Sequence, residues 1–396
     1  MAFIRSNFFI IFSIIHLVLV GLSIAFLGQG YKGDTGFYIE IAKGFSNFIF
    51  FDPLLNWKFG PAYPFFLLIF GGFIDYNIYW IAIIQALLFI IASYKMCNAL
   101  FKENALKPFT IMMLFPSFIL TNSTLMSESL CGTLILATIY LVFYSRNIHR
   151  DKLASLVVGC LIMIRFEMLV FVFVIFMVAL IKRQLSSYRQ AIVWLSIPIL
   201  FIGLNSWKNL MTYDVLTPTS FGGGTVIYGG NNAGLDGSWH PHSLYKGYIS
   251  EDREEEYLYL AEEKDFKTSV QKQDALYKEM ALSSWRSNFS DHILLIPIKW
   301  LRTWLLPAEL DIFTMTPVSQ NRGLRIVDHF GDQFSFLGKF KHAIYILFHW
   351  LGLIIIAFGF IRLRKFSKTN IAHEFILLNS FYIFISASIL YSTIFY

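Results

Sequence analysis

The chain has 396 residues, of which 56% are hydrophobic, 18% aromatic and only 15% charged, and its mean hydropathy is +0.58. These values exclude an ordinary soluble domain and predict an all-α polytopic membrane protein. Lys and Arg in cytoplasmic loops explain the net charge of +6. Because no basic patch with interleaved aromatic residues is present, nucleic acid is excluded as a partner.

Eight apolar segments are long enough to span or nearly span a bilayer. They cover residues 7–27, 61–94, 106–122, 125–145, 152–181, 189–206, 342–361 and 372–395. We expect the first to be a retained helix, since it is long for a secretory signal and no cleavage pattern follows it. Cys97, Cys131 and Cys160 lie in or beside these segments without metal-ligand spacing, which predicts small core residues and no disulfide framework.

Two of the apolar segments are interrupted. In residues 61–94, Gly71-Gly72 and Asp75-Tyr76-Asn77 leave a front part that is short for a full crossing. Residues 152–181 carry Arg165 and Glu167 near their middle, which predicts two short helices meeting at a polar bend.

The loop charges predict which side of the membrane each segment faces. The clusters that would be cytoplasmic contain Arg5; Lys95, Lys102 and Lys107; Arg146, Arg150 and Lys152; Lys182, Arg183 and Arg189; and Arg362, Arg364, Lys365 and Lys368. Asp34, residues 122–128, the bend at Arg165 and residues 207–292 then all fall on the extracytoplasmic side. This assignment requires one net crossing between residues 61 and 94.

We divide the chain into three parts. Residues 1–206 form a transmembrane module, residues 207–292 an extracytoplasmic loop region with amphipathic helices, and residues 293–396 an interfacial segment followed by C-terminal transmembrane helices. Within the loop region, residues 217–241 predict turns because they are rich in Gly, Asn and Thr. Residues from about 251 to 285 predict a helix with one apolar face, formed by Tyr277, Met280, Ala281 and Trp285.

Asp34, directly after the first apolar segment, is the most informative residue. A carboxylate at the membrane boundary is within reach of a lipid headgroup and close enough to low-dielectric surroundings to act as a base. The alternative is that Asp34 caps the N-terminus of the following helix. Glu40 is expected on the same short interfacial helix, on another face.

Further candidates lie deeper in the chain. Lys58 precedes Gly60-Pro61-Ala62-Tyr63-Pro64, whose prolines fix the start of a helix; alternatively, Lys58 is a snorkelling interfacial residue. Glu128 is expected about one turn into an apolar helix, where an unpaired carboxylate is costly. It therefore has either a structural partner in Arg165 or a direct role in a site.

The loop Gly229-Gly230-Asn231-Asn232-Ala233-Gly234 combines flexible glycines with two amides that can bind sugar hydroxyls or phosphate. The alternative is a loop of turns without a ligand. His240 and His242 are two residues apart, which is more typical of solvated side chains than of a metal site, and no strong metal-ligand set is present.

In this order, the acidic residue after the first helix, the Pro61-Ala62-Tyr63-Pro64 motif, Glu128, Arg165 and the Gly-Asn-Asn loop resemble the bacterial GT-C superfamily of integral membrane glycosyltransferases. The similarity is to the branch of protein O-mannosyltransferases and lipid A aminoarabinose transferases, and it extends from the first helix to about Pro307. It implies a GT-C-like helical bundle with interfacial helices in an extracytoplasmic first loop and one larger extracytoplasmic loop.

The resemblance also implies an activity. A sugar would pass, with inversion, from a polyprenyl-phosphate-linked donor to a lipid, glycan or protein acceptor at the extracytoplasmic face of a bacterial cytoplasmic membrane. Asp34 would be the catalytic base, and Lys58 with Arg165 or Arg302 would hold the phosphate. Asn231 and Asn232 would contact the donor, and the supporting residues would be Glu128, Glu40, Tyr63 and His240. No cofactor is demanded, although a divalent metal ion is compatible with the family.

Two other functions remain open. A transporter or flippase of lipid-linked sugars would use the same charged residues to line a pathway, and it predicts inverted repeats with broken helices in matching halves. An O-antigen polymerase or ligase would depend on Arg and His residues in the large loop, for which His240 and Arg253 are the candidates.

Overall fold

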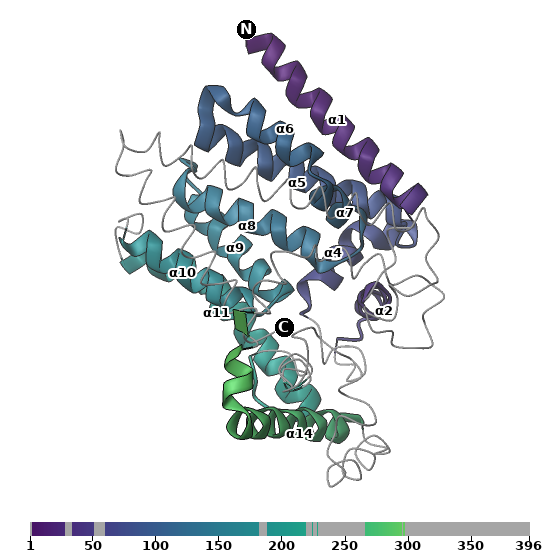
Figure 1. Ribbon diagram of the computed structural model, residues 1–396, viewed down its shortest axis with the longest axis vertical. Helices are drawn as coiled ribbons and strands as arrows, with labels where there is room; N and C mark the ends of the chain where they lie inside the picture. The colour runs from purple at the N-terminus through teal and green to yellow at the C-terminus, as the bar shows by residue number, and fades with distance from the viewer. Residues whose placement is uncertain are drawn as a thin grey trace. The chain divides into compact units, whose positions relative to one another are not determined.

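The computed structural model in Figure 1 describes residues 2–27, 34–50, 60–181, 188–218, 224, 228, 266–294 and 296–297. Within these ranges the chain is mostly helical and has no β-strand. It divides into two compact units, Met1–Ser220 and Phe221–Tyr396.

The first unit is a bundle of helices. Its elements are α1 (Ala2–Leu27), α2 (Thr35–Ser46), α4 (Ala62–Gly71), the 3₁₀ helix η1 (Gly72–Ile74), α5 (Ile78–Phe101), the 3₁₀ helix η2 (Lys102–Asn104), α6 (Leu106–Leu114), α7 (Pro116–Ser123), α8 (Ser127–Phe143), α9 (Arg150–Ile164), α10 (Met168–Ile181) and α11 (Tyr188–Tyr213). Helix α5 packs against α1 and α8, α8 also packs against α9, and α9 packs against α11. Helix α2 packs against α4.

The expected interruption in residues 61–94 is confirmed. Asp75 and Tyr76 have positive φ angles of 49° and 55°, a left-handed conformation that ends η1. Asn77 then caps α5 by accepting a hydrogen bond from the backbone N–H of Trp80 at 3.2 Å. Of this segment, α5 is long enough to cross a membrane, whereas α4 and η1 are a shorter apolar stretch.

Residues 106–122 form two helices, and the expectation of one continuous segment is wrong. The backbone of Phe115 is extended, at φ −72° and ψ 120°, because a residue before proline is sterically disfavoured from helical geometry. The next helix, α8, begins at Ser127, so Glu128 is its second residue and lies within the first turn. A carboxylate there is favoured by the positive end of the helix dipole.

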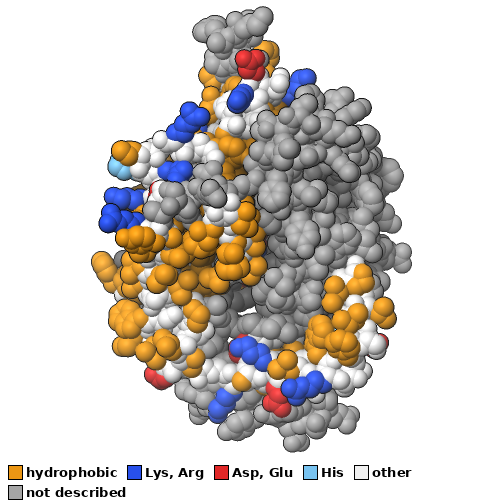
Figure 2. Space-filling model, turned by 90° about the vertical axis from the view of Figure 1, so that its left-hand side faces the viewer, with side chains coloured by type: hydrophobic (Ala, Val, Ile, Leu, Met, Phe, Trp, Pro, Cys, Tyr) orange, Lys and Arg blue, Asp and Glu red, His pale blue; other side chains and the backbone are white. Residues whose placement is uncertain are grey.

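Three described helices are long and apolar enough to cross a membrane, which indicates a membrane protein. Their apolar spans are Asn7–Ala25, Ile78–Asn104 and Tyr188–Tyr213. Many apolar side chains of α1, α10 and α11 are exposed, among them Ile14, Phe173 and Ile199, and Figure 2 shows such side chains gathered over one face of the molecule. The expected segments 342–361 and 372–395 lie outside the described residues.

Helices α9 and α11 lie side by side and run in the same direction. Trp194 donates its indole N–H to Asp151 at 3.3 Å, and the backbone N–H of Ile197 donates to the hydroxyl of Ser155 at 3.3 Å. These partners are 43 and 42 residues apart, a nearly constant offset that parallel helices produce and antiparallel helices do not. Helix α10, which lies between α9 and α11 in the sequence, runs back in the opposite direction. Residues 152–181 therefore form two helices joined by the predicted bend at residues 165–167.

In the second unit, α14 (Phe266–Ser287) is the main described helix. Its residues Leu276, Tyr277, Met280 and Ala281 are buried together with Tyr228. Three of these belong to the predicted apolar face, and Trp285, the fourth predicted member, stacks on His292 at a ring-centroid distance of 4.7 Å.

Candidate functional site

The candidate site is built around a break between α7 and α8. Thr124 and Met126 are extended, with φ/ψ of −102°/144° and −129°/151°, so helical hydrogen bonding stops there. The carbonyl of Thr124 instead accepts from the side-chain amide of Gln85 at 3.0 Å. The carbonyl of Leu125 accepts from the hydroxyl of Thr35 at 3.0 Å. The break is therefore satisfied by side chains from α5 and α2, which join at this point.

Thr35 fastens the start of α2 to this break and so places Asp34, its neighbour in the chain. Asp34 occupies the N-cap position, but its side chain makes no capping hydrogen bond. Asp34 is therefore the N-cap residue by position, but its carboxylate does not cap the helix. Glu40 lies on the same helix and is exposed, whereas Tyr38 and Ile39 face the interior.

Glu128 and Arg165 form an ion pair. The guanidinium of Arg165 donates to the carboxylate of Glu128 at 2.8 Å, with 29% and 39% of the two side chains exposed. Tyr38 donates to the hydroxyl of Ser127 at 3.2 Å, and Ser127 donates to Glu128 at a long 3.4 Å. The structural pair anticipated between Glu128 and Arg165 is confirmed, and it is connected to α2 through Ser127.

The charges of Asp34, Glu128 and Arg165 all affect the pKa of Tyr38. Burial raises its pKa above the ordinary value, the hydrogen bond to Ser127 opposes that shift, Glu128 and Asp34 add to it and Arg165 counteracts it. The phenol is therefore neutral at physiological pH and acts as a hydrogen-bond donor. The phenol therefore lies within electrostatic range of Asp34, Glu128 and Arg165.

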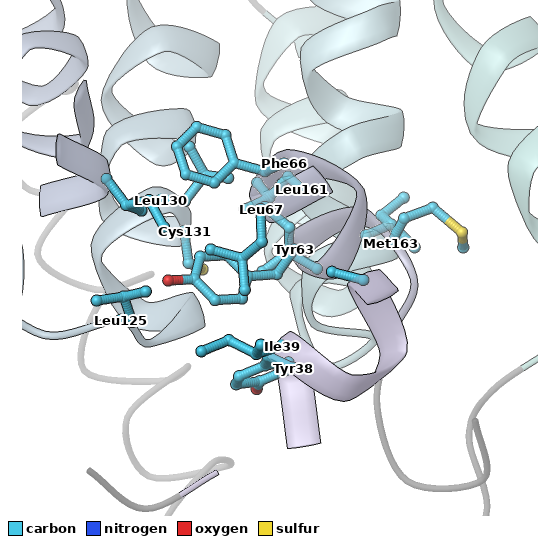
Figure 3. Packing of buried hydrophobic residues seen from close by; sticks show 14 of the residues in the cluster. Tyr38, Ile39, Tyr63, Phe66, Leu67, Leu125, Leu130, Cys131, Leu161 and Met163 are labelled. Atoms are coloured by element: carbon cyan, nitrogen blue, oxygen red, sulfur yellow. The ribbon is translucent and has the colours of Figure 1, made fainter. Parts of the chain in front are cut away.

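Tyr63 packs against Tyr38 and joins it to α5. Its ring packs edge-on against Tyr38 at 4.9 Å, and its hydroxyl donates to Gln85 at 2.7 Å. In Figure 3 the Tyr63 hydroxyl points to the side of Leu125, above Tyr38 and Ile39. Tyr63 is fully buried, so its role is to orient its neighbours rather than to contact a ligand.

A second set of hydrogen bonds joins α1 to the same break. The ring atom Nδ1 of His16 lies 2.7 Å from the carbonyl of Met113, so it must carry the proton, and Nε2 accepts from the amide of Asn122 at 3.0 Å. The side-chain Oδ1 of Asn122 accepts from the hydroxyl of Ser129 at 2.7 Å. These hydrogen bonds connect the segment between Asn122 and Ser129 to α1 and, through His16, to α6.

Gly60 brings the start of α4 against the end of α9. A Cβ at this position would lie 2.1 Å from the carbonyl oxygen of Met163 and 3.0 Å from that of Ile164, so only glycine fits. Ile164 is followed directly by Arg165. The Gly-Pro motif therefore packs beside the residue that pairs with Glu128.

The structure brings Asp34, Tyr63, Glu128 and Arg165 into one region of the first unit. Glu40 is exposed on α2, and the other predicted site residues lie outside the described residues: Lys58, Asn231, Asn232, His240 and Arg302. Within the described part of the chain, no group of three or more His, Cys, Asp or Glu side chains could hold a metal ion.

Several residues of this region were not predicted from the sequence. Tyr38, Thr35 and Ser127 link α2 to α8, and Gln85 and His16 reach the break from within apolar helices. Gln85 and His16 carried a usable signal, because a lone polar side chain in a membrane helix needs a partner. No protein-family model matches the chain, and no curated protein and no solved structure is detectably similar to it.

Proposed function

We propose that the chain is an inverting glycosyltransferase that takes a sugar from a polyprenyl-phosphate donor at the extracytoplasmic face of a bacterial cytoplasmic membrane. One observation carries the proposal. Thr35 fastens Asp34 to the α7–α8 break at 3.0 Å, three residues before Glu128 and its partner Arg165. The proposal is supported by a carboxylate and a cation that lie in the same region of the first unit, around Tyr38.

The chemistry divides between these groups. The acceptor oxygen attacks the anomeric carbon while its proton passes to the carboxylate of Asp34. The bond between the anomeric carbon and the phosphate oxygen breaks, and polyprenyl phosphate leaves with the bonding electrons. Arg165 faces the growing negative charge, and Glu128 orients its guanidinium. A single direct displacement inverts the anomeric centre.

The proposed sidedness rests on helix directions. Because α9 and α11 are parallel, the bend at Arg165 and the C-terminal end of α11 lie at the same end of the bundle. The basic residues Arg146, Arg150 and Arg189 lie at the opposite end of these helices, as the positive-inside rule expects for the cytoplasm. The number of membrane crossings and the identity of the membrane as a bacterial cytoplasmic membrane belong to the same proposal.

The test is Asp34→Asn, which keeps the shape of the side chain and removes its basicity. We expect transfer to fall by at least about 1000-fold, because the attacking hydroxyl loses its proton acceptor. The assay is sugar release from a set of polyprenyl-phosphate donors by the purified full chain. Asp75→Asn is the matched control, since Asp75 is exposed at the bend before α5 and should leave transfer unchanged. Normal turnover by Asp34→Asn refutes the assignment.

The helix breaks at Phe115, at residues 124–126 and at Arg165 favour a second candidate, a flippase of lipid-linked sugars. Such a protein would move a fluorescent polyprenyl-phosphate sugar between the leaflets of proteoliposomes without releasing the sugar. Movement without transfer would replace the proposed reaction, whereas sugar release without movement supports it.

A further inference from the structure

The last turns of α11 carry a polar face that the proposed reaction does not use. Asn205, Lys208, Asn209 and Thr212 are spaced i, i+3, i+4 and i+7, so they lie along one side of the helix. Other positions nearby, such as Leu204, expose apolar side chains. An otherwise apolar helix therefore presents amide, ammonium and hydroxyl groups together at one end.

The two amides on this face have fixed orientations. The Nδ2 atom of Asn205 donates to the carbonyl of Pro218 at 3.0 Å, and that of Asn209 donates to the carbonyl of Thr217 at 2.8 Å. Turning either amide over would set two oxygens against each other. Asn205 must therefore keep its Oδ1 atom as an acceptor on this face.

Two polar atoms here are left without a partner. Asn205 and Thr212 are only 4% and 7% exposed, yet neither Oδ1 of Asn205 nor Oγ1 of Thr212 has a hydrogen-bond partner among the described residues. Buried polar atoms are almost always paired, since an unpaired one loses its hydration without compensation. The pair of unsatisfied atoms, seven residues apart on one face, marks a place that a ligand would complete.

This face lies at the same end of the bundle as Arg165. The offset of 42 residues between α9 and α11, read from Ser155 and Ile197, puts residue 207 of α11 at the level of Arg165. A Cβ added at Gly159 would lie 3.0 Å from the side chains of Ile197 and Phe201, so glycine at this position allows α9 and α11 to pack closely.

We propose that the Asn205–Lys208–Thr212 face binds a phosphorylated polyol. The ammonium of Lys208 pairs with the phosphate, and the hydroxyl of Thr212 donates to a phosphate oxygen. Oδ1 of Asn205 accepts from a hydroxyl of the ligand, because an ionised phosphate has no proton to give. A plain anion would leave this acceptor unsatisfied. The inference does not depend on sugar transfer, since binding alone tests it.

The experiment measures binding to the purified full-length chain by titration calorimetry, with two probes of the same chemistry. Dihexanoyl phosphatidylglycerol represents a lipid headgroup, and glucose 1-phosphate represents a free sugar phosphate. Dihexanoyl phosphatidylcholine, which has the phosphate but no free hydroxyl, is the reference and should bind at least about tenfold more weakly. Binding of the first probe names a lipid headgroup as the source, and binding of the second names a sugar phosphate.

The decisive variant is Thr212→Val, which has nearly the same shape and removes the unpaired hydroxyl. We expect binding to weaken about tenfold while thermal stability stays the same or rises, because a buried unsatisfied oxygen has been removed. Thr138→Val is the matched control, since the hydroxyl of Thr138 is also buried without a partner but lies on α8. It should leave binding unchanged.

Lys208→Met keeps the aliphatic stem and should abolish binding of either probe. The proposal is overturned if neither probe binds more tightly than phosphatidylcholine. It is equally overturned if Thr212→Val binds as tightly as the unmodified chain while remaining folded.

Discussion

The two ends of α9 each place an arginine beside a carboxylate, with different results. At its start, Arg150 contacts Asp151 at 3.0 Å, and Asp151 also accepts from Trp194 and Gln190 of α11. Just beyond its end, Arg165 pairs with Glu128 at 2.8 Å, across 37 residues and beside the break between α7 and α8. Asp151 joins two continuous helices, α9 and α11, whereas Glu128 lies where α8 begins and pairs with an arginine just beyond the end of α9.

This contrast separates stability from function. The contacts of Asp151 join two unbroken helices without the loss of any backbone hydrogen bond, so helix packing is enough to explain them. Helix breaks at residues 124–126 and 165–167 forgo helical hydrogen bonds, and side chains must replace them. Local departures from regular structure are expected where a site requires them. Loss of the first pair should therefore affect folding, and loss of the second should affect activity.

The sharpest test removes one charge from each end. In Glu128→Gln, Arg165 loses the carboxylate that orients it, and we expect the kcat of sugar transfer to fall about 100-fold. In Asp151→Asn, transfer per folded molecule should be unchanged. Its hydrogen bonds from Trp194 and Gln190 weaken, so the free energy of unfolding should fall by about 1–2 kcal/mol, measured by thermal unfolding in detergent. Opposite results would reverse the two assignments.

A smaller effect is expected from Gly60→Ala, which alters only the packing of α4 against the end of α9 that carries the proposed site. The new methyl would meet the carbonyl of Met163, so the start of α4 must shift, at a cost of about 1–3 kcal/mol in the free energy of unfolding. Transfer should fall as well, because Arg165 follows that carbonyl closely. In the control Gly132→Ala, nothing lies within 4 Å of the added methyl, so stability should hold or rise. Equal losses in both variants would contradict the close approach.

The smallest expected effect comes from Tyr38→Phe, which removes the link between α2 and Ser127. Loss of this hydrogen bond should lower the free energy of unfolding by about 1 kcal/mol and transfer severalfold. Because the pKa of Tyr38 is raised, its hydroxyl stays protonated, and the variant's rate should follow pH as in the unmodified chain between about pH 6 and 9. Tyr79→Phe, at an exposed position of α5, is the control. A changed pH profile would mean that Tyr38 itself exchanges a proton.

The sequence was sufficient to predict features that depend on local chemistry. Asp75 before Asn77 and Arg165 with Glu167 are polar groups inside apolar runs, and each marks the end of a helix in the structure. The pairing of Glu128 with Arg165 was one of two alternatives that followed from the cost of an unpaired carboxylate in an apolar helix.

Long-range hydrogen bonds could not be predicted in this way. Thr35 and Leu125 are 90 residues apart, and Tyr38 and Ser127 are 89 apart, so no spacing in the sequence relates them. An interruption between residues 122 and 125 was expected, but the groups that satisfy its backbone could not be predicted, for a related reason. Its carbonyls accept from Gln85 and Thr35, and only those distant partners make an interrupted helix tolerable. Helix α11 continues past residue 206 because its added polar residues end the apolar run but not the helix.

The bond between His16 and Asn122 has a consequence for how the protein is made. Its partners are 106 residues apart, so α1 enters the membrane before the chain that completes its polar contact exists. At about 5–20 residues per second, a ribosome needs roughly 5–20 s to supply that chain. During this interval the His16 imidazole lacks the Asn122 amide, and this hydrogen bond can form only once α7 has been made.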